Sequence, residues 1–256
     1  MPGVVALEVT DRVALITIRR PEARNAVNAA VAAGIDDALE RIEADGDIWV
    51  GVLTGEGSVF SAGADLRAIA DGERLGMVTE RGGFGGLTKR DRRKPLIAAV
   101  DGPALAGGLE LALACDLIVA SRNAVFGLPE VKRSLIAAGG GLFRLPRALG
   151  QKVAMEMILT GDPISAERAY QLGLVNRVVE PGEVVSAALA LAARIALNAP
   201  FAVWESRQVA ANAWTGDDHH AWQATAEAAS KIARSEDFAE GPRAFVEKRP
   251  PRWEGR

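Results

Sequence analysis

Four short apolar runs recur along the chain, with longer segments of mixed composition between them. They occupy residues 13–18, 48–53, 96–100 and 117–120. Runs of this length that are rich in Val and Ile are typical of strands, and those with almost no polar residue are typical of strands buried on both faces. After Val27, apolar residues recur at helical spacing, with Asn25 or Asn28 as a possible N-cap of the expected helix. Strands that alternate with helices predict an α/β fold with a parallel sheet and right-handed crossovers.

The last part of the chain has a different character, because helical patterns replace the buried runs. Ser165 is placed to cap a short helix that Gly173 would end. From Gly182 onward the sequence is rich in alanine and helical in pattern. We therefore expect an α/β core over residues 1–195 and a helical oligomerisation region over residues 196–256.

The composition excludes several classes of protein. Of the 256 residues, 49% are hydrophobic and 25% are charged, which is ordinary for a globular chain and argues against disorder. The formal net charge is −3, whereas nucleic-acid binders usually carry a basic excess. Uncharged stretches reach only about eleven residues, short of the ~18 that a membrane span needs. With one cysteine, Cys115, and no signal-like N-terminus, we expect a cytoplasmic protein that binds neither nucleic acid nor membrane.

A strand-to-helix turn at residues 101–115 (DGPALAGGLELALAC) contains the first candidate site. The apolar run 96–100 ends just before it, and we expect a helix to open near Gly107. Gly107 and Gly108 have no Cβ, so a bulky ligand could approach the backbone where the free N–H groups of a helix start favour negative charge. The alternative interpretation is that the glycine pair only permits close packing of the chain.

Two glutamates follow in apolar surroundings. Glu110 has only glycine, alanine and leucine at its helical i±3 and i±4 positions, where a charge is costly unless it is paired or used. The alternative is a carboxylate that merely suits the helix dipole. Glu130 ends the segment FGLPE, and the helix and two short strands between the two glutamates could return the chain to its start. The two carboxylates could then divide acid and base work in one cavity.

A third segment, FSAGADL at residues 60–66, follows the buried run at residues 48–53. Its small residues again permit a ligand to approach the backbone closely. The N–H groups of Ala64 and Gly107 could together bind one developing oxyanion. We therefore expect carboxylates and backbone amides to provide the chemistry of an active site.

Histidine chemistry is poorly placed in this chain. The two histidines, His219 and His220, are adjacent, so their side chains would point in different directions from a helix. They follow Asp217 and Asp218, as expected of a solvated first helical turn in which acidic residues are favourable. We expect no metal site here and no Ser-His-Asp or Cys-His mechanism.

Residues 71–94 combine a glycine-rich loop with a basic run. The loop is long and irregular, and loops of this kind are often functional. The basic run KRDRRK at residues 89–94 has two interpretations, a solvated helix face or a local attraction for phosphate groups.

Seven segments of the chain, taken in order, resemble the crotonase family, the enoyl-CoA hydratase/isomerase superfamily. They are RPEARNAVN (20–28), FSAGADL (60–66), KPLIAAVDGPALAGGLELALACD (94–116), AVFGLPEV (124–131), GGGLFRLPRALG (139–150), AMEMILTGDPISAERAYQLGLVNRVV (154–179) and GPRAFVEKR (241–249). These segments extend along nearly the whole chain. Each is weak alone, but their combination in this order is highly specific for the superfamily.

The resemblance implies the fold and assembly of that family. The fold is a spiral of ββα turns with a helical C-terminal region, and the usual assembly is a trimer, or a hexamer that is a dimer of trimers. The substrate is an acyl-CoA thioester, so coenzyme A is part of the substrate and no separate cofactor is implied. The metabolic setting implied is fatty acid metabolism such as β-oxidation.

The resemblance also implies roles for individual residues. The oxyanion hole would be formed by the N–H groups of Ala64 and Gly107, and the catalytic glutamates would be Glu110 and Glu130. The contacts to coenzyme A and the substrate would fall on Ala23, Arg24, Ala62, Asp65, Leu66, Gly108, Pro129 and Ala138.

The activity that the resemblance implies is enoyl-CoA hydratase, which adds water across the 2,3 double bond of a 2-enoyl-CoA to give a 3-hydroxyacyl-CoA. Glu110 would hold the water and Glu130 would protonate Cα. Isomerases of the family commonly keep only the acid at the position of Glu130. Dienoyl isomerases use an aspartate where this chain has Ala138. Both comparisons favour a hydratase over an enoyl-CoA isomerase, which is the nearest alternative.

Two further alternatives concern the substrate and the class of protein. The family often has Gly at the position of Ser134 and Pro-Gly at Ala137 and Ala138, near the acyl pocket, which suggests a specialised acyl group. The loop at residues 82–88 and the C-terminal tail also resemble the carnitinyl-CoA dehydratase (crotonobetainyl-CoA hydratase) branch. Some homologues lack the acids and act as binding or scaffold proteins, RNA binders included. Both glutamates and the nearly neutral net charge argue against that role here.

Overall fold

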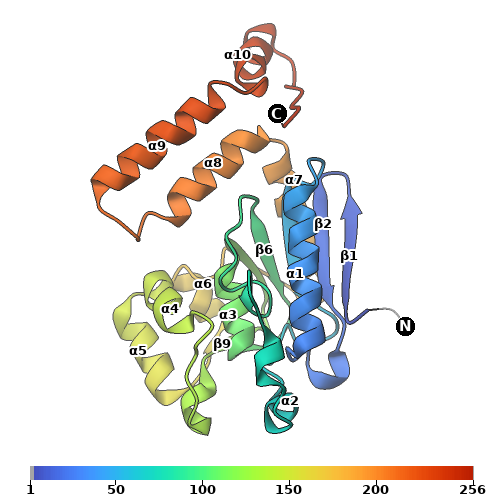
Figure 1. The fold of residues 1–256 in the computed structure, drawn as a ribbon, viewed down its shortest axis with the longest axis vertical. Helices are drawn as coiled ribbons and strands as arrows, with labels where there is room; N and C mark the ends of the chain where they lie inside the picture. The colour runs from blue at the N-terminus through green and yellow to red at the C-terminus, as the bar shows by residue number, and fades with distance from the viewer. Residues whose placement is uncertain (1–2, 256) are drawn as a thin grey trace.

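The core of the described chain, residues 3–255, is a six-stranded sheet. The structure is a computed structural model, and it describes the side chains of all these residues except 73 and 74. The strands, in spatial order, are β1 (Val5–Thr10), β2 (Val13–Ile18), β3 (Val50–Gly55), β6 (Leu96–Val100), β8 (Leu117–Ser121) and β11 (Arg177–Val179). β1 and β2 are antiparallel, and the other neighbours are parallel. The predicted α/β fold with a parallel sheet is confirmed (Figure 1).

Side chains alternate between the two faces of this sheet and pack into two apolar cores. On β6, Ala98 packs with residues of α1 (Ala29–Ala44), whereas Ile97 packs with residues of α7 (Val184–Ala196). Both side chains are fully buried because helices cover both faces, which is why the strand has no polar residue. Asn28, one of two candidates from the sequence, caps α1 by accepting a 3.0 Å hydrogen bond from the Val31 N–H.

The chain forms a spiral in which a strand of the six-stranded sheet is followed by a short strand of a second, three-stranded sheet. β6 continues into β7 (Ala104–Leu105) and α3 (Gly107–Ala114), and β8 continues into β9 (Val125–Gly127). β7 pairs with β9 in parallel just as β6 pairs with β8, so successive turns lie directly on one another. The spiral of ββα turns that the sequence implied is therefore confirmed. It places the start of α3 at the junction of the large sheet and the small one.

A second group of helices packs around α3. α4 (Gly141–Leu149) lies against α3, and α5 (Gln151–Thr160) lies against both α4 and the 3-10 helix Pro129–Arg133. β10 (Ile164–Ser165) pairs with β9 and leads into α6 (Ala166–Gln171). The Ser165 hydroxyl accepts a 3.2 Å hydrogen bond from the Arg168 N–H, so the predicted cap of this helix is confirmed.

The segment between β3 and β6 carries α2 (Leu66–Ala70) and a small hairpin of β4 (Val78–Thr79) and β5 (Gly83–Phe84). The basic run at residues 89–94 follows the hairpin and is not helical, so the predicted solvated helix face is wrong. Arg90 pairs with Asp36 and Glu40 of α1, and Arg92 pairs with Asp116. These two arginine side chains are held inside the fold, whereas Lys89 and Arg93 of the same run remain exposed.

The C-terminal helices form a layer beyond the upper edge of the sheet (Figure 1). They are α8 (Pro200–Ala211), α9 (Asp218–Ile232) and α10 (Asp237–Glu247). Trp204 of α8 is 2% exposed and donates its indole N–H to the Trp49 carbonyl at 3.1 Å, so it belongs to the core of its own chain. Trp214 and Trp222 are 72% and 73% exposed. These two side chains therefore remain available for an interface between chains.

Two strand predictions from the sequence differ from the structure. β1 was not expected, because Glu8 and Thr10 interrupt its apolar pattern and this edge strand is half exposed. β3 begins at Val50 rather than Ile48, since Ile48 and Trp49 are buried ahead of the ladder. Within residues 3–255 no single helix is long and apolar enough to cross a membrane; α7 and α8 qualify only as a pair bent by 108°.

Candidate active site

Two loops that are far apart in the sequence meet at one end of the sheet. The Ala62 N–H donates to the Arg24 carbonyl at 3.0 Å, and the Ser61 hydroxyl donates to the Asn25 carbonyl at 2.8 Å. These bonds join the turn after β2 to the segment after β3. The structure thereby brings together the residues predicted to contact coenzyme A, which are Ala23, Arg24, Ala62, Asp65 and Leu66.

The carboxylate of Asp65 locks this junction. It accepts a 3.0 Å hydrogen bond from Arg20 and also accepts from the N–H groups of Arg67 and Ala68 at the start of α2. Burial alone would raise the pKa of Asp65, but these donors outweigh burial and hold it below its usual value. Leu66, the next residue, is 49% exposed. Asp65 therefore fixes the loop, while the apolar side chain of Leu66 remains exposed beside it.

The N–H groups of Ala64 and Gly107 lie on neighbouring stretches of backbone. Gly63 has φ +86°, and a Cβ there would lie only 2.6 Å from the Gly107 nitrogen. Val27 forms an isolated β-bridge with Ala64, in which the Gly63 carbonyl accepts from the Val27 N–H and the Asp65 N–H donates to the Val27 carbonyl. The N–H of Ala64 takes no part in this bridge. Gly107 is the first residue of α3, so its N–H has no acceptor within the helix. Both predicted donors are thus on adjoining backbone and outside the regular ladders.

Ala106, directly before Gly107, has a backbone conformation that L-residues avoid. Its φ is +52° and its ψ is −128°. Strain of this kind is of order 1–3 kcal/mol and persists only where the surroundings enforce it. Here the Ala106 N–H donates to the Gly127 carbonyl at 2.9 Å, and its own carbonyl accepts from the Glu110 N–H. The strained residue fixes the direction in which the Gly107 N–H points.

Glu110 lies in the first turn of α3 and is 4% exposed. Its Oε1 accepts a 2.9 Å hydrogen bond from the Gly141 N–H at the start of α4. Burial raises the pKa of Glu110, whereas hydrogen bonds from Gly141 and Gly139 and the charge of Arg144 oppose that rise. A buried carboxylate that is held by amide donors and a nearby cation is suited to accept a proton or to hold a water molecule.

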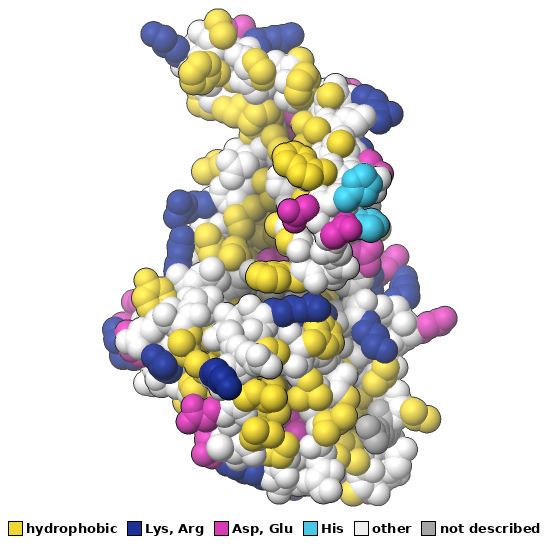
Figure 2. All heavy atoms as spheres, turned by 90° about the vertical axis from the view of Figure 1, so that its left-hand side faces the viewer, with side chains coloured by type: hydrophobic (Ala, Val, Ile, Leu, Met, Phe, Trp, Pro, Cys, Tyr) yellow, Lys and Arg dark blue, Asp and Glu magenta, His cyan; other side chains and the backbone are white. Residues whose placement is uncertain are grey.

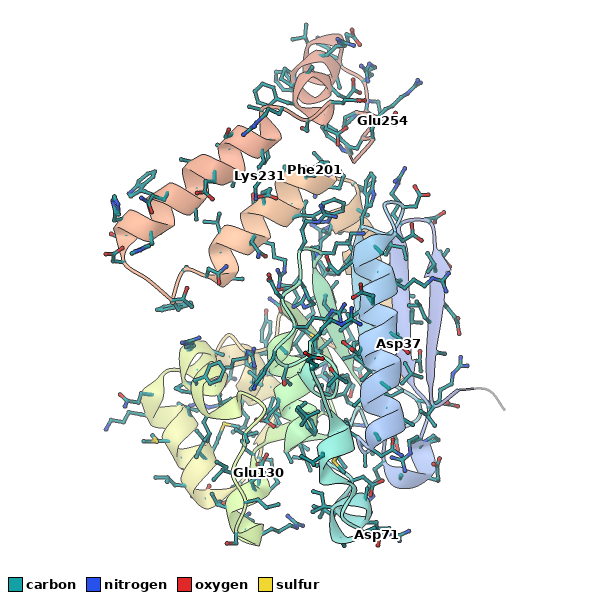
Figure 3. The ribbon with its side chains drawn as sticks, viewed as in Figure 1. Asp37, Asp71, Glu130, Phe201, Lys231 and Glu254 are labelled. Carbon is teal, nitrogen blue, oxygen red and sulfur yellow. The ribbon has the colours of Figure 1, made fainter. Side chains whose placement is uncertain are left out.

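Glu130 lies in the 3-10 helix Pro129–Arg133, beside α5 (Figure 3). Its Oε2 is buried and has no hydrogen-bond partner among the described residues. Burial raises the pKa of Glu130 to about 7, and the charge of Glu110 adds to this rise. A carboxyl oxygen without a donor favours the protonated form, so Glu130 is suited to give a proton.

The two predicted acids therefore come together in unlike environments. Glu110 influences the titration of Glu130, although they lie on different elements of the spiral. Glu110 has donors that favour its ionised form, whereas Glu130 has an oxygen without any. Such a pair can divide base and acid work at neutral pH. In residues 3–255 no cluster of three or more His, Cys, Asp or Glu side chains could hold a metal ion.

The remaining predicted residues have varied surroundings. Gly108 is buried, and a Cβ there would overlap the Ser61 carbonyl, so its small size lets α3 pack on the 60–66 segment. Pro129 directly precedes Glu130 and packs against Gly161. Ala138 is exposed and donates its N–H to the Ile136 carbonyl at 2.9 Å. For Gly108 the structure thus supports the packing interpretation of the glycine pair.

Sequence reasoning missed three features of this site. The turn Gly139–Gly141 holds the Glu110 carboxylate, and Arg144 braces this turn. The Phe84 ring lies against Gly107, where an added Cβ would be 2.5 Å from two ring carbons. The run of three glycines before an amphipathic helix was the one local signal. The contacts of Arg144 and Phe84 depend on the tertiary path of the chain.

Comparison with known families gives a match over almost the whole chain. The family model described as enoyl-CoA hydratase/isomerase matches residues 8–256.

Three proteins illustrate the likeness. Mevalonyl-coenzyme A hydratase sidH of Aspergillus fumigatus is 40% identical over 256 residues, which cover 95% of this chain and 92% of that protein. Carnitinyl-CoA dehydratase of Salmonella paratyphi A is 40% identical over 247 residues and 94% of each chain. The crystal structure of enoyl-CoA hydratase EchA1 from Mycobacterium marinum superposes with a TM-score of 0.96 at 50% identity, covering 99% of this chain and 100% of that one.

Proposed function

The chain belongs to the enoyl-CoA hydratase/isomerase family, and on that premise we propose that it hydrates a 2-enoyl-CoA thioester to a 3-hydroxyacyl-CoA. Its fold is the crotonase fold of enoyl-CoA hydratases. The single observation that supports hydration best is the pair of acids in unlike environments, Glu110 with amide donors and Glu130 with an orphaned oxygen. Double-bond isomerisation needs one proton carrier, whereas hydration also needs a group that holds the attacking water.

In the proposed reaction, Glu110 holds the water and takes one of its protons as the oxygen attacks Cβ. Glu130 gives its proton to Cα, so one water is added in total. A proton then passes from Glu110 to Glu130 through solvent to restore the starting state. Negative charge develops meanwhile on the thioester oxygen, where the N–H groups of Ala64 and Gly107 would stabilise it.

Coenzyme A would enter this reaction as part of the substrate, without a separate cofactor. Its nucleotide end would lie on the joined loops, at Ala23, Arg24, Ala62, Asp65 and Leu66. The acyl chain would pass the backbone at Gly107 and Gly108 and end near Pro129 and Ala138.

A second candidate is a hydratase of the carnitinyl-CoA dehydratase type. The 40% identity over 247 residues to a protein of that name favours it, as does the departure from the usual family residues at Ser134 and Ala138. The chemistry at Glu110 and Glu130 would be the same, and only the acyl substituent would differ.

We also propose a trimer, or a hexamer that is a dimer of trimers. Large apolar side chains of the C-terminal helices, Trp222, Phe245 and Val246 among them, are 73%, 85% and 77% exposed. Figure 2 shows many hydrophobic side chains on the outer surface of this layer. Apolar surface of this extent is typical of subunit interfaces. A cytoplasmic location fits the lone Cys115.

The test of the function is a hydration assay. The protein is incubated with crotonyl-CoA and then with a panel of substituted enoyl-CoA thioesters, crotonobetainyl-CoA included, while the enone absorbance is followed. We expect the absorbance to fall as 3-hydroxyacyl-CoA forms, and the fastest substrate identifies the acyl group. An unchanged absorbance with every thioester at micromolar enzyme would contradict the proposal.

A further inference from the structure

Arg144 of α4 is half-buried near Glu110 but belongs to neither the oxyanion donors nor the coenzyme A loops. Its Nη2 donates to the Thr88 carbonyl at 2.7 Å, and its Nη1 donates to the Gly139 carbonyl at 3.2 Å. Thr88 is 2% exposed. The guanidinium therefore joins the loop after β5 to the turn that begins α4.

The turn braced by Arg144 is also the turn that holds Glu110. The Gly141 N–H donates to Glu110 at 2.9 Å, and Gly139 lies against the other carboxylate oxygen. Gly140, between them, has φ +109°, and a Cβ there would overlap the Arg144 guanidinium. One side of this three-residue turn thus contacts the carboxylate and the other contacts the arginine. A shift of Arg144 would move the amide that fixes Glu110.

The charge of Arg144 has no carboxylate partner at ion-pair distance among the described residues. Its guanidinium bonds only to carbonyl oxygens, and its titration is influenced by Glu110, Arg147, Arg92 and Cys115. Of these groups, Glu110 carries the acidic charge that faces it at neutral pH. On the side of the 3-10 helix Pro129–Arg133, Glu110 faces Glu130, a like charge when ionised. Arg144 is the cation that opposes the effect of burial on the pKa of Glu110.

We infer that Arg144 is a positioning residue for the Glu110 carboxylate, acting through the Gly139–Gly141 turn that it braces and through the positive charge that it places there. The inference rests on the proposed function, in which Glu110 holds and deprotonates the attacking water. Arg144 itself touches no reacting atom.

The consequence is a defined dependence on pH. Burial raises the pKa of Glu110, and the charge of Arg144 opposes this rise. Without that charge the pKa of Glu110 rises further, so a larger fraction of the carboxyl is protonated in mildly acid solution. A protonated Glu110 cannot accept the proton of the water. The acid limb of the rate profile should therefore move to higher pH.

The experiment compares three variants of the full chain, with kcat/KM for hydration measured across pH 5 to pH 9. In Arg144→Gln the charge is lost, and we expect the acid limb to move up by about 1 pH unit. In Arg144→Lys the charge stays but the two-carbonyl brace is lost, so kcat falls about tenfold with the acid limb near its wild-type position. Arg147→Gln is the matched control, because Arg147 is an exposed arginine of the same helix that stacks on the same Phe143 ring.

The outcomes separate the inference from the function. An inactive wild-type protein would contradict the proposed function. An active wild type with an unshifted acid limb in Arg144→Gln would overturn the inference alone, as would an equal shift in Arg147→Gln. If Arg144→Gln does not fold, as judged by circular dichroism, Arg144→Lys decides. A lowered kcat of Arg144→Lys, with the acid limb of its pH profile where the wild type has it, supports the inference. A kcat of Arg144→Lys equal to that of the wild type overturns it.

Discussion

The Gly141 N–H donates a 2.9 Å hydrogen bond to the carboxylate of Glu110. This bond joins the first turn of α3 to the first residue of α4, so both helix starts meet at one buried acid. Helix starts carry free N–H groups and a partial positive charge, which stabilise a carboxylate. These donors oppose the rise in the pKa of Glu110 that burial causes, whereas Glu130 has a buried carboxyl oxygen without any donor.

The pH dependence of hydration follows from the pKa of Glu130. Burial raises this pKa to about 7, and the proposed acid must be protonated in the free enzyme. As the pH rises through about 7, Glu130 loses its proton, so kcat/KM for hydration should fall. The measurement is the alkaline limb of the kcat/KM profile with an enoyl-CoA substrate. A profile that stays flat up to pH 9 would exclude Glu130 as the acid.

The free energy of unfolding should also depend on the protonation of Glu130. In the unfolded chain Glu130 titrates near 4.5, and in the folded chain burial raises its pKa to about 7. Between these values the folded state keeps a proton that the unfolded state has lost, so the free energy of unfolding falls as the pH rises. Glu130→Gln should remove this part of the decline. Urea unfolding of both proteins at pH 4.5 and pH 7 measures it, and equal declines would contradict the shift.

The oxyanion donors can be tested through Gly63. A methyl group in Gly63→Ala would lie 2.6 Å from the Gly107 nitrogen. We expect kcat/KM to fall by about 100-fold or more, as when one oxyanion donor is removed. Gly72→Ala is the matched control, because Gly72 also has a positive φ of +83° but no atom within 4 Å of the added Cβ. An active Gly63→Ala variant, or an equal loss in Gly72→Ala, would argue against this donor site.

The assembly can be tested through the exposed face of α9. Trp222 is 73% exposed in the single chain, and burying an aromatic side chain of this size would stabilise an interface. Sedimentation should show a trimer or hexamer rather than a 26.9 kDa monomer. The Trp222→Ala assembly should dissociate into monomers at a higher protein concentration than the wild-type assembly does. Glu227→Ala, at an exposed position on another face of the same helix, should not. A stable monomer at micromolar concentration would refute the proposal.

The sequence predicted the elements whose signals are local. The bounds of β2 and β6 match the apolar runs, and Asn28 and Ser165 cap the helices that they begin, because strand burial and capping depend on neighbouring residues. β1 was missed because an edge strand lacks a continuous apolar pattern. That Glu110 and Glu130 could share one cavity was inferred from the helix and two short strands between them, and the resemblance implied their catalytic roles.

The surroundings of Glu110 could not be predicted in the same way. Arg144 bonds to Thr88, which is 56 positions away in the chain, and no local pattern indicates such a contact. The basic run at residues 89–94 was misjudged for a similar reason. Its arginines pair with carboxylates of α1 and of the turn before β8, which only the fold brings near.

The most direct test of the account is the Glu110→Ala variant, followed in two assays at once. One assay measures 3-hydroxyacyl-CoA formation from an enoyl-CoA, and the other measures entry of solvent deuterium at Cα of an acyl-CoA. If Glu110 holds the water and Glu130 handles the proton at Cα, the variant loses hydration by about 100-fold or more but retains deuterium exchange. A Glu110→Ala protein that still hydrates enoyl-CoA at the wild-type rate would contradict the account and make Glu110 a structural residue.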